Sequence, residues 1–378
     1  MVIGIKDGLK LFGISVVFFC SVFVCTFFLN YYIDAQTIAD VVSGELKVLY
    51  DANMASAKFT CAITGGVLCL IAVVMTVFYI KLFIDGNAKR FGILKAMGYS
   101  DNRIALSFWV FGLSTFIGCA VGYGAGHAIM PVIYREMTID GMPAISIGYH
   151  AELLAALVIA PTVLFSALSC LYAKLSLRRG IIDIIKGGKS TVKSKRRSSD
   201  RSRSFLVEIC LSTLASKKSA VFFVAFACFC YSAMLQMGLA MSDVSSVIMG
   251  VMILVIGAVL GVTALFMAVT TAINANKSSV AVMKAFGYSA KERAFALLLG
   301  YVPFALLGFA LGTVYQHVLM TVMVNVVFAD VESVAIYSFG VPEFFITLST
   351  FIVLYTAAMA AYSYKISRVS VKEIMSAE

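Results

Sequence analysis

Long apolar runs separated by short polar stretches constrain the fold more than any other feature of this sequence. A helix needs about 20 apolar residues to cross a bilayer, whereas a barrel strand needs only about 9–11 alternating residues. Only helices and closed barrels satisfy backbone polar groups in lipid. The sequence therefore predicts an all-α integral membrane protein with eight transmembrane helices. The runs that reach helical length are residues 11–33, 58–82, 104–130, 149–173, 219–239, 246–275, 294–325 and 342–364.

Composition excludes a soluble domain. Hydrophobic residues make up 61% of the chain and charged residues 13%, against about 45–50% and roughly 25% in a soluble domain. We therefore expect a multi-pass protein of the cell (plasma or inner) membrane, in contact with its lipids. The nine cysteines lie mostly in apolar runs and include no CxxC pair, so neither a disulfide framework nor a metal site is predicted.

Basic residues set the orientation, because Lys and Arg concentrate in cytoplasmic segments. All but three of the 30 Lys and Arg residues lie on one side of the predicted spans, and only Lys47, Lys58 and Arg135 lie on the other. Both termini are therefore predicted to be cytoplasmic. The same distribution explains the net charge of +10. No folded basic domain remains for a nucleic-acid partner.

A basic segment divides the chain. Residues 186–203 (KGGKSTVKSKRRSSDRSR) are rich in Ser, Lys and Arg and contain no aromatic residue, which is typical of a linker that lies against anionic headgroups. We predict a first four-helix unit over 1–185, a basic cytoplasmic linker over 186–204, and a second four-helix unit over 205–378.

The two units repeat one another. Residues 92–100 read GILKAMGYS and residues 281–289 read AVMKAFGYS, and each stretch is a short connector between two apolar runs. Four spans return the chain to its starting side, so the sequence predicts parallel repeats related by an axis along the membrane normal. The glycines of the third and seventh runs are spaced for close helix packing. At a step of 190 residues, Gly118, Gly122 and His127 recur as Gly308, Gly312 and His317.

Each connector has the residues of a short docking helix. A helix over 92–97 would place Ile93, Leu94 and Met97 along one apolar edge beside Lys95, and Gly98 would end it by accepting a positive φ. The alternative is an ordinary turn between two helices. The repetition of the stretch favours a docking role.

The connectors resemble the motif E-[IF]-G-[IV]-L-[KR]-A-[LMI]-G of the FtsX/MacB-type ABC transporter permease family. RFGILKAMGYS matches it closely, whereas SSVAVMKAFGYS has Ala281 in place of a glycine, and both copies lack the usual Glu. The resemblance implies two FtsX-like four-helix units whose connectors couple to a separate ATPase. The coupling residues it implies are Gly92, Ile93, Leu94, Lys95, Met97, Gly98, Val282, Met283, Lys284, Phe286 and Gly287.

The chain itself lacks the means to hydrolyse ATP. The fragment GGKST at 187–191 has Asp183 where a P-loop needs its first glycine, so no P-loop is present. No segment contains a Ser/His/Asp set or a metal-binding pattern. We therefore expect a non-enzymatic subunit without a cofactor of its own, with Mg-ATP bound by two copies of an ABC ATPase subunit.

Few residues suggest a substrate path. His127 and His317 occupy equivalent positions near the outer ends of their spans, and Tyr134 follows the first of them. Such residues can line a lateral cavity that receives a substrate. The alternative is that they are interfacial side chains with no contact to a substrate, and for the histidines this alternative is favoured.

Three functions remain open. The first is a permease that couples ATP hydrolysis to export of an amphipathic or hydrophobic substrate (a peptide, lipid or antimicrobial) by mechanotransmission. Because only about 25 residues separate the first two spans, a MacB-like pump with a large extracytoplasmic domain is disfavoured. The second is a non-transporting transducer or scaffold that contacts an extracytoplasmic partner through outward loops 34–57 and 131–148. An ATP-independent carrier is disfavoured, because the spans lack charged relay residues.

Overall fold

The protein is helical wherever its structure is regular. The computed structural model describes residues 8–137, 143, 145–178, 218–244, 247–275, 283–284, 286–289, 292, 299–327 and 337–368, and no strand occurs among them. Within these residues seven helices are long and apolar enough to cross a membrane. An eighth candidate is a pair of helices, Cys69–Asp85 and Arg90–Ala96, bent by 69°. Seven spans, or eight if the bent pair is one span, agree with the predicted membrane protein.

Contacts divide the described helices into two compact units, with α1 to α7 in the first and α10, α11, most of α14 and α15 in the second. The predicted linker over 186–204 and both chain ends lie outside the described residues. The predicted unit boundaries and the cytoplasmic termini therefore stay predictions.

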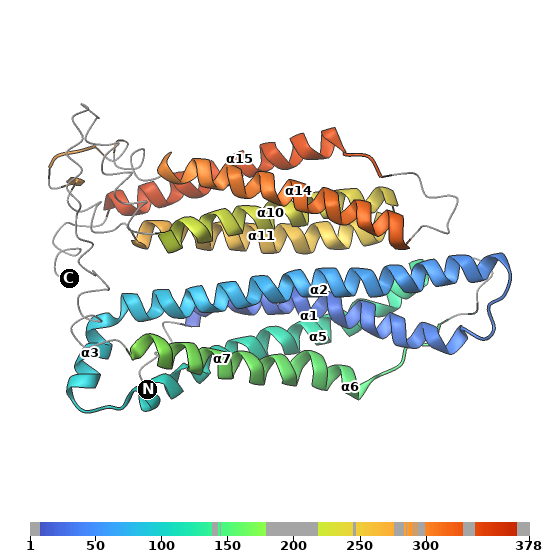
Figure 1. Cartoon of the computed structure of the whole chain (residues 1–378), viewed down its shortest axis with the longest axis horizontal. Helices are drawn as coiled ribbons and strands as arrows, with labels where there is room; N and C mark the ends of the chain where they lie inside the picture. Colours follow the sequence, from blue (N-terminus) through green and yellow to red (C-terminus); the bar gives the residue numbers. More distant parts are fainter. Residues whose placement is uncertain are drawn as a thin grey trace. The chain divides into compact units, whose positions relative to one another are not determined.

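Four long helices of the first unit run alongside one another (Figure 1). Helix α1 packs against α2 and α5, and α5 packs against α7. The long helices are α1 (Gly8–Ala35), α2 (Glu45–Gly86), α5 (Val110–Met137) and α7 (Ala160–Leu177). The short elements are η2 (Gln36–Ile38), α3 (Ala88–Ala96), α4 (Asp101–Leu106), η3 (Ser107–Trp109), α6 (Ala151–Leu154) and the π-helical turn η4 (Ala155–Ile159).

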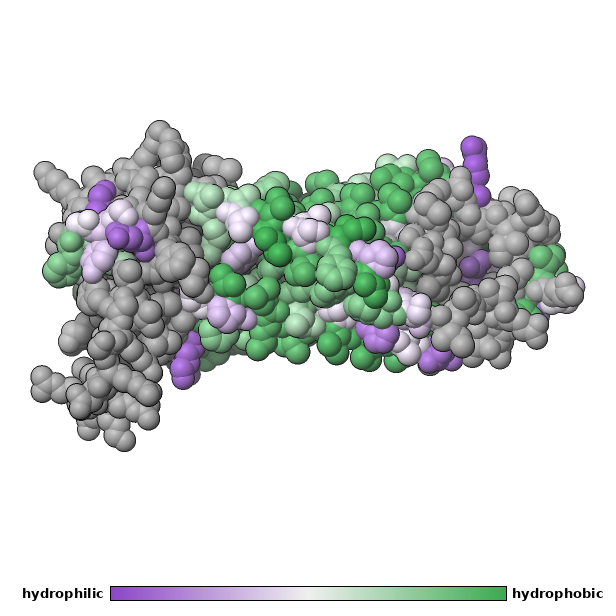
Figure 2. All heavy atoms as spheres, turned by 90° about the horizontal axis from the view of Figure 1, so that it is seen from above, coloured by the Kyte–Doolittle hydropathy of each residue, from purple (hydrophilic) through white to green (hydrophobic). Residues whose placement is uncertain are grey.

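The second unit has the same order of long helices (Figure 1). They are α10 (Lys218–Val244), α11 (Val247–Ala275), α14 (Val302–Val327) and α15 (Val341–Arg368), with the 3-10 turn η5 (Leu299–Tyr301) before α14. Helix α10 packs against α11, and α15 packs against both. Apolar side chains cover the middle of the face shown in Figure 2, and polar ones gather toward its two ends, as a membrane-spanning surface requires.

Glycines bring the third helix of each unit against the first, as their spacing predicts. A Cβ atom at Gly118 or Gly122 of α5 would collide with backbone oxygens of α1. A Cβ atom at Gly308 or Gly312 of α14 would collide with backbone oxygens of α10. The predicted packing seams are confirmed in both units. The facing residues are Ser15 and Phe19 in α1, and Ala225 and Phe229 in α10.

These contacts extend the repeat to the first helix of each unit. Gly118 and Gly308 are 190 positions apart, but their partners Ser15 and Ala225 are 210 apart. The first unit therefore has 20 more residues between its first and third helices. Helix α2 accounts for much of the difference, since it has 42 residues and α11 has 29.

The prediction of an outward loop over 34–57 was wrong, because α2 begins at Glu45. Two contacts hold the first turns of α2, residues 45–58, against the end of α1. The Tyr50 hydroxyl donates to the Ala35 carbonyl at 2.8 Å, and the Lys58 ammonium lies 4.6 Å from the centre of the Tyr32 ring. The predicted loop over 131–148 is also shorter, because α5 continues past Pro131 to Met137.

Candidate functional site

The first connector is a helix that ends in a glycine turn. Helix α3 ends at Ala96, and Gly98 has φ 89°. The Gly98 N–H donates to the Lys95 carbonyl at 3.0 Å, and the Tyr99 N–H donates to the Leu94 carbonyl at 3.1 Å. This pair of bonds is a Schellman motif, which satisfies carbonyls that the helix end would leave unbonded. The predicted positive φ at Gly98 is confirmed.

The second connector repeats this geometry. Gly287 has φ 83°. Its N–H donates to the Lys284 carbonyl at 3.1 Å, and the Tyr288 N–H donates to the Met283 carbonyl at 3.1 Å. Among the described residues, Gly44 is the only other one with a positive φ. The two connectors thus share one backbone turn as well as a similar sequence.

A serine follows each glycine turn, and in the first copy it caps the next helix, α4. The Ser100 hydroxyl accepts from the Arg103 N–H at 3.4 Å at the start of α4. In the second copy, both the N–H and the hydroxyl of Ser289 donate to Glu292 Oε2 at 2.9 Å. These two bonds favour the ionised carboxylate and lower the pKa of Glu292. Serine and glutamate three residues apart form a capping box.

The apolar residues of the connectors differ in exposure. Ile93 is 58% exposed, Met97 61% and Phe286 72%. Phe286 occupies the position of Met97 in the repeat, so each connector presents one large exposed apolar side chain at that position. Leu94 is half-buried, and its counterpart Met283 is fully buried. Among the remaining coupling candidates, Gly92 is buried, and Val282 lies outside the described residues.

Lys95 joins the first connector to the last helix of its unit. Its Nζ atom donates to the carbonyl oxygen of Leu177 at 2.5 Å and forms an ion pair with Asp101 Oδ1 at 2.9 Å. Leu177 is the last residue of α7, where carbonyls lack partners within the helix. The Lys95 side chain is only 13% exposed, so it is a structural link rather than a free surface charge.

A cluster of phenylalanines anchors the same connector to α2. Phe83 of α2 has its ring 5.7 Å from that of Phe108 and 6.2 Å from those of Phe91 and Phe111. Phe91, Phe108 and Phe111 are almost fully buried. The base of α3 is therefore part of the core, while its end with Ile93 and Met97 projects from it.

The two histidines predicted for a substrate path lie in matching surroundings. The Nδ1 atom of His127 donates to the Tyr123 carbonyl at 3.2 Å, and the His127 ring lies 5.8 Å from that of Tyr149. The His317 ring lies 5.8 Å from that of Phe339, which matches Tyr149 in the repeat. In each unit an aromatic side chain from the segment before the fourth helix covers the histidine.

Tyr134 belongs to a buried polar cluster. Its hydroxyl donates to Asp34 Oδ2 at 2.9 Å, and the same oxygen accepts from the Asn30 amide at 2.7 Å and the Gly148 N–H at 3.1 Å. The Nε2 atom of His150 donates to Asp34 Oδ1 at 2.8 Å. Asp34 is 3% exposed. The cluster fastens the segment before α6 to the ends of α1 and α5.

Two carboxylates that were not among the predicted site residues, Asp34 and Glu343, lie near the ends of candidate spans. Asp34 lies within the candidate span Phe12–Ile38, and Glu343 lies within Val341–Ala360. Both carboxylates lie near the ends of these spans, so the expectation that the spans lack charged relay residues stays a prediction. The spacing of Asn30 and Asp34, one helical turn apart at the end of an apolar run, was a usable signal. Within the described part of the chain, no group of three or more His, Cys, Asp or Glu side chains could hold a metal ion.

Comparison with known families agrees with this geometry. The family model described as FtsX-like permease C-terminal matches residues 62–181 and 219–371. Each matched segment contains one connector and its Schellman turn. Searches of curated proteins and of solved structures found no match.

Proposed function

Because this chain belongs to the FtsX-like permease family, we propose that it is the membrane subunit of an ABC transporter and that a separate ATPase drives it. One observation carries the proposal: the two connectors are similar in sequence and share a glycine turn, and each presents an exposed apolar side chain. Two equivalent connectors would engage two copies of an ATPase subunit, one for each repeat.

The exposed side chains of the connectors provide the docking energy. Met97 and Phe286 are exposed by more than half, and full burial of such a side chain contributes about 1.5–3 kcal/mol. Ile93 lies one helical turn before Met97, on the same face of α3. A shallow apolar groove on the ATPase suits this surface, with Lys284 and Tyr288 beside Phe286 in the second copy.

Lys95 provides a route for motion into the membrane unit. A displacement of α3 moves the Leu177 carbonyl directly through the bond from Lys95, so α7 follows the connector. The Phe83 cluster passes the same displacement to α2. Movement of the ATPase would thus change the packing of two membrane helices at once.

The substrate that fits best is amphipathic or hydrophobic and is taken from the membrane for export. The glycine seams hold the first and third helices of each unit in close backbone contact, and we place the change in packing that drives export at these seams. The histidines under Tyr149 and Phe339 lie beside these seams and are our candidates for contact with the substrate.

A second candidate, a transducer that contacts an extracytoplasmic partner, is favoured by one feature. Helix α2 has 42 residues, about twice the ~20 needed to span. Its first turns, together with the segment before them, present Val41 and Val48 to solvent, at 69% and 45% exposure. These turns would be the contact surface for the partner.

The test is binding of a candidate ATPase and the rate of ATP hydrolysis in nanodiscs. Met97→Gln plus Phe286→Gln removes the exposed apolar surface without adding a charge, and Met97→Leu plus Phe286→Leu is the matched apolar control. We expect the glutamine pair to weaken binding at least tenfold and the leucine pair to bind like wild type. Equal binding of all three would reject the connectors as docking sites.

The rate of ATP hydrolysis separates the two candidate functions. Hydrolysis stimulated by an amphipathic substrate supports export, whereas stimulation only by an extracytoplasmic protein supports the transducer.

A further inference from the structure

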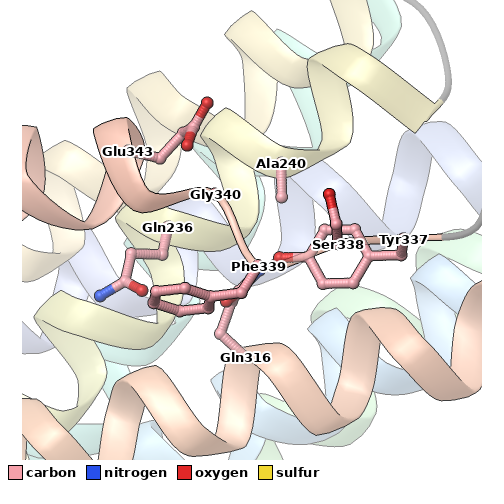
Figure 3. Close-up of a pocket in the computed structure, with 8 residues that line it drawn as sticks. All are labelled: Gln236, Ala240, Gln316, Tyr337, Ser338, Phe339, Gly340 and Glu343. Carbon is pink, nitrogen blue, oxygen red and sulfur yellow. Dashed lines mark hydrogen bonds between the residues drawn. The ribbon is translucent and has the colours of Figure 1, made fainter.

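The second unit contains a small pocket beside the start of α15. It lies between α10, α14 and the residues that lead into α15 (Figure 3), and it holds about 30 Å³. A cavity needs roughly 10–15 Å³ by this measure to hold one water molecule, so the pocket has room for one small ligand. The lining residues are Gln236, Ala240, Gln316, Tyr337, Ser338, Phe339, Gly340 and Glu343.

Two glutamines turn their acceptor groups to this pocket. The Gln236 amide donates through Nε2 to Ser232 and Thr313 at 2.9 and 2.8 Å. The Gln316 amide donates through Nε2 to the Tyr337 hydroxyl at 2.8 Å. The two glutamines are 3% and 2% exposed. Among the described residues nothing donates to their carbonyl oxygens, so both remain available to a ligand.

Glu343 adds a negative charge. Its Oε2 atom is buried and has no hydrogen-bond partner among the described residues. A Cβ atom at Gly340 would collide with this oxygen, so the glycine leaves the space that the carboxylate occupies. A buried carboxylate oxygen without a partner is costly in a membrane protein, and such groups pair with a cation or mark a binding site.

In the first unit, a polar side chain fills the position that corresponds to this pocket. Asn30 stands where the second unit has Ala240, and its amide donates to Asp34 and to the Gly148 carbonyl. Four donors from the protein thus satisfy Asp34 in the first unit. In the second unit Ala240 leaves the space empty, and the acceptor oxygens lack such donors.

We propose that this pocket binds one small monovalent cation, either a bare alkali ion or the ammonium head of an amine. Glu343 balances its charge, and the carbonyl oxygens of Gln236 and Gln316 replace part of its hydration. All these ligands are oxygens, which suit hard cations and N–H donors. The site belongs to the second unit alone, and it does not depend on the transport direction or on the ATPase.

The experiment is thermal unfolding of the purified full chain in detergent at constant ionic strength. The cations are sodium, potassium or methylammonium, each compared with N-methyl-D-glucamine, which is too large for the pocket. We expect a saturable rise of a few degrees with at least one small cation, as for any ligand that binds only the folded state. Comparison of the unfolding temperatures in the alkali ions and in methylammonium shows whether the site prefers a bare ion or an ammonium group.

Variants test whether this pocket causes the cation-dependent rise in unfolding temperature. Glu343→Gln removes the charge, and Ala240→Asn fills the space as in the first unit. Both should abolish the cation-dependent rise. Glu152→Gln removes an exposed carboxylate from the first turn of α6 and should leave the rise unchanged. If all cations give the same midpoint in wild type, or if the rise persists in Ala240→Asn, the pocket holds only water and the proposal fails.

Discussion

The Nζ atom of Lys95 lies 2.5 Å from the carbonyl oxygen of Leu177, 82 residues further along the chain. This bond joins the connector that we assign to ATPase docking to the end of α7. It also explains why a lysine, with a long side chain and three donors, suits this position: Nζ reaches the helix end while it pairs with Asp101.

Replacement of Lys95 by methionine should uncouple the permease without loss of docking. The methionine keeps most of the apolar stem but cannot donate to Leu177 or pair with Asp101. A hydrogen bond to a charged group contributes about 1.5–3 kcal/mol, so we expect the stimulation of ATP hydrolysis by the permease to fall about tenfold while ATPase affinity is unchanged. Lys95→Arg, which retains the donors, should keep most of the stimulation. A parallel loss of affinity and stimulation in Lys95→Met would instead show that Lys95 acts in docking.

Gly98→Ala should destabilise the first connector through backbone conformation alone. No atom lies within 4 Å of a Cβ at Gly98, but its φ is 89°, and an L-residue pays about 1–2 kcal/mol there. Gly98→Asn should cost less, because asparagine tolerates this region better. Hydrogen exchange of residues 92–100 and ATPase binding measure the effect. Gly124→Ala is the control, since that glycine also has open space but an ordinary helical φ. Equal effects at both positions would contradict the assignment.

Asp34→Ala should loosen the end of the first unit opposite the connectors. The change leaves the Gly148 N–H without its acceptor and removes one of the acceptors of the Asn30 amide, and a buried donor without a partner costs about 1–3 kcal/mol. We expect a lower unfolding temperature and faster hydrogen exchange in residues 145–150. Asp40→Ala removes a nearby exposed carboxylate and should change neither quantity. A wild-type response in Asp34→Ala would show that the cluster does not hold this segment.

The capping box at Ser289 should depend on pH. The bonds from Ser289 place the pKa of Glu292 lower in the folded protein than in the unfolded chain. Its contribution is therefore complete above the ordinary pKa range of glutamate and is lost as the pH falls through the lowered pKa. Hydrogen exchange around residues 286–292, corrected for the intrinsic rate, should accelerate over that interval in wild type. Glu292→Gln should show weaker protection at neutral pH and no such transition, whereas Glu152→Gln should behave as wild type.

Rules that concern only neighbouring residues predicted much of the fold and the glycine turn of the connectors. The lengths of the apolar runs predicted membrane helices, because the bilayer sets the length of a span. The repeated GYS endings predicted that Gly98 stops its helix, because only glycine takes a positive φ without strain. These inferences depend on neighbouring residues alone, and the structure agrees with them.

Which residues are exposed, and which elements they contact, could not be predicted from neighbouring residues in the sequence. Leu94 and Met283 occupy equivalent positions and both read as docking residues, but Met283 is fully buried. Which side of a short helix faces the core depends on the elements packed against it. The helical extension of α2 to Glu45 was missed for a similar reason, since its polar turns are held by contacts with the end of α1.

By itself, therefore, the sequence determined the membrane class, the helical character of the spans and the glycine turns, since each follows from the apolar length or the backbone freedom of contiguous residues. Only the tertiary structure decided the bond from Lys95 to Leu177, the burial of Asp34 and the pocket beside Ala240. Each of these joins residues far apart in the chain, and the free energy of a buried charge or polar group depends on which partners the fold brings within hydrogen-bond distance.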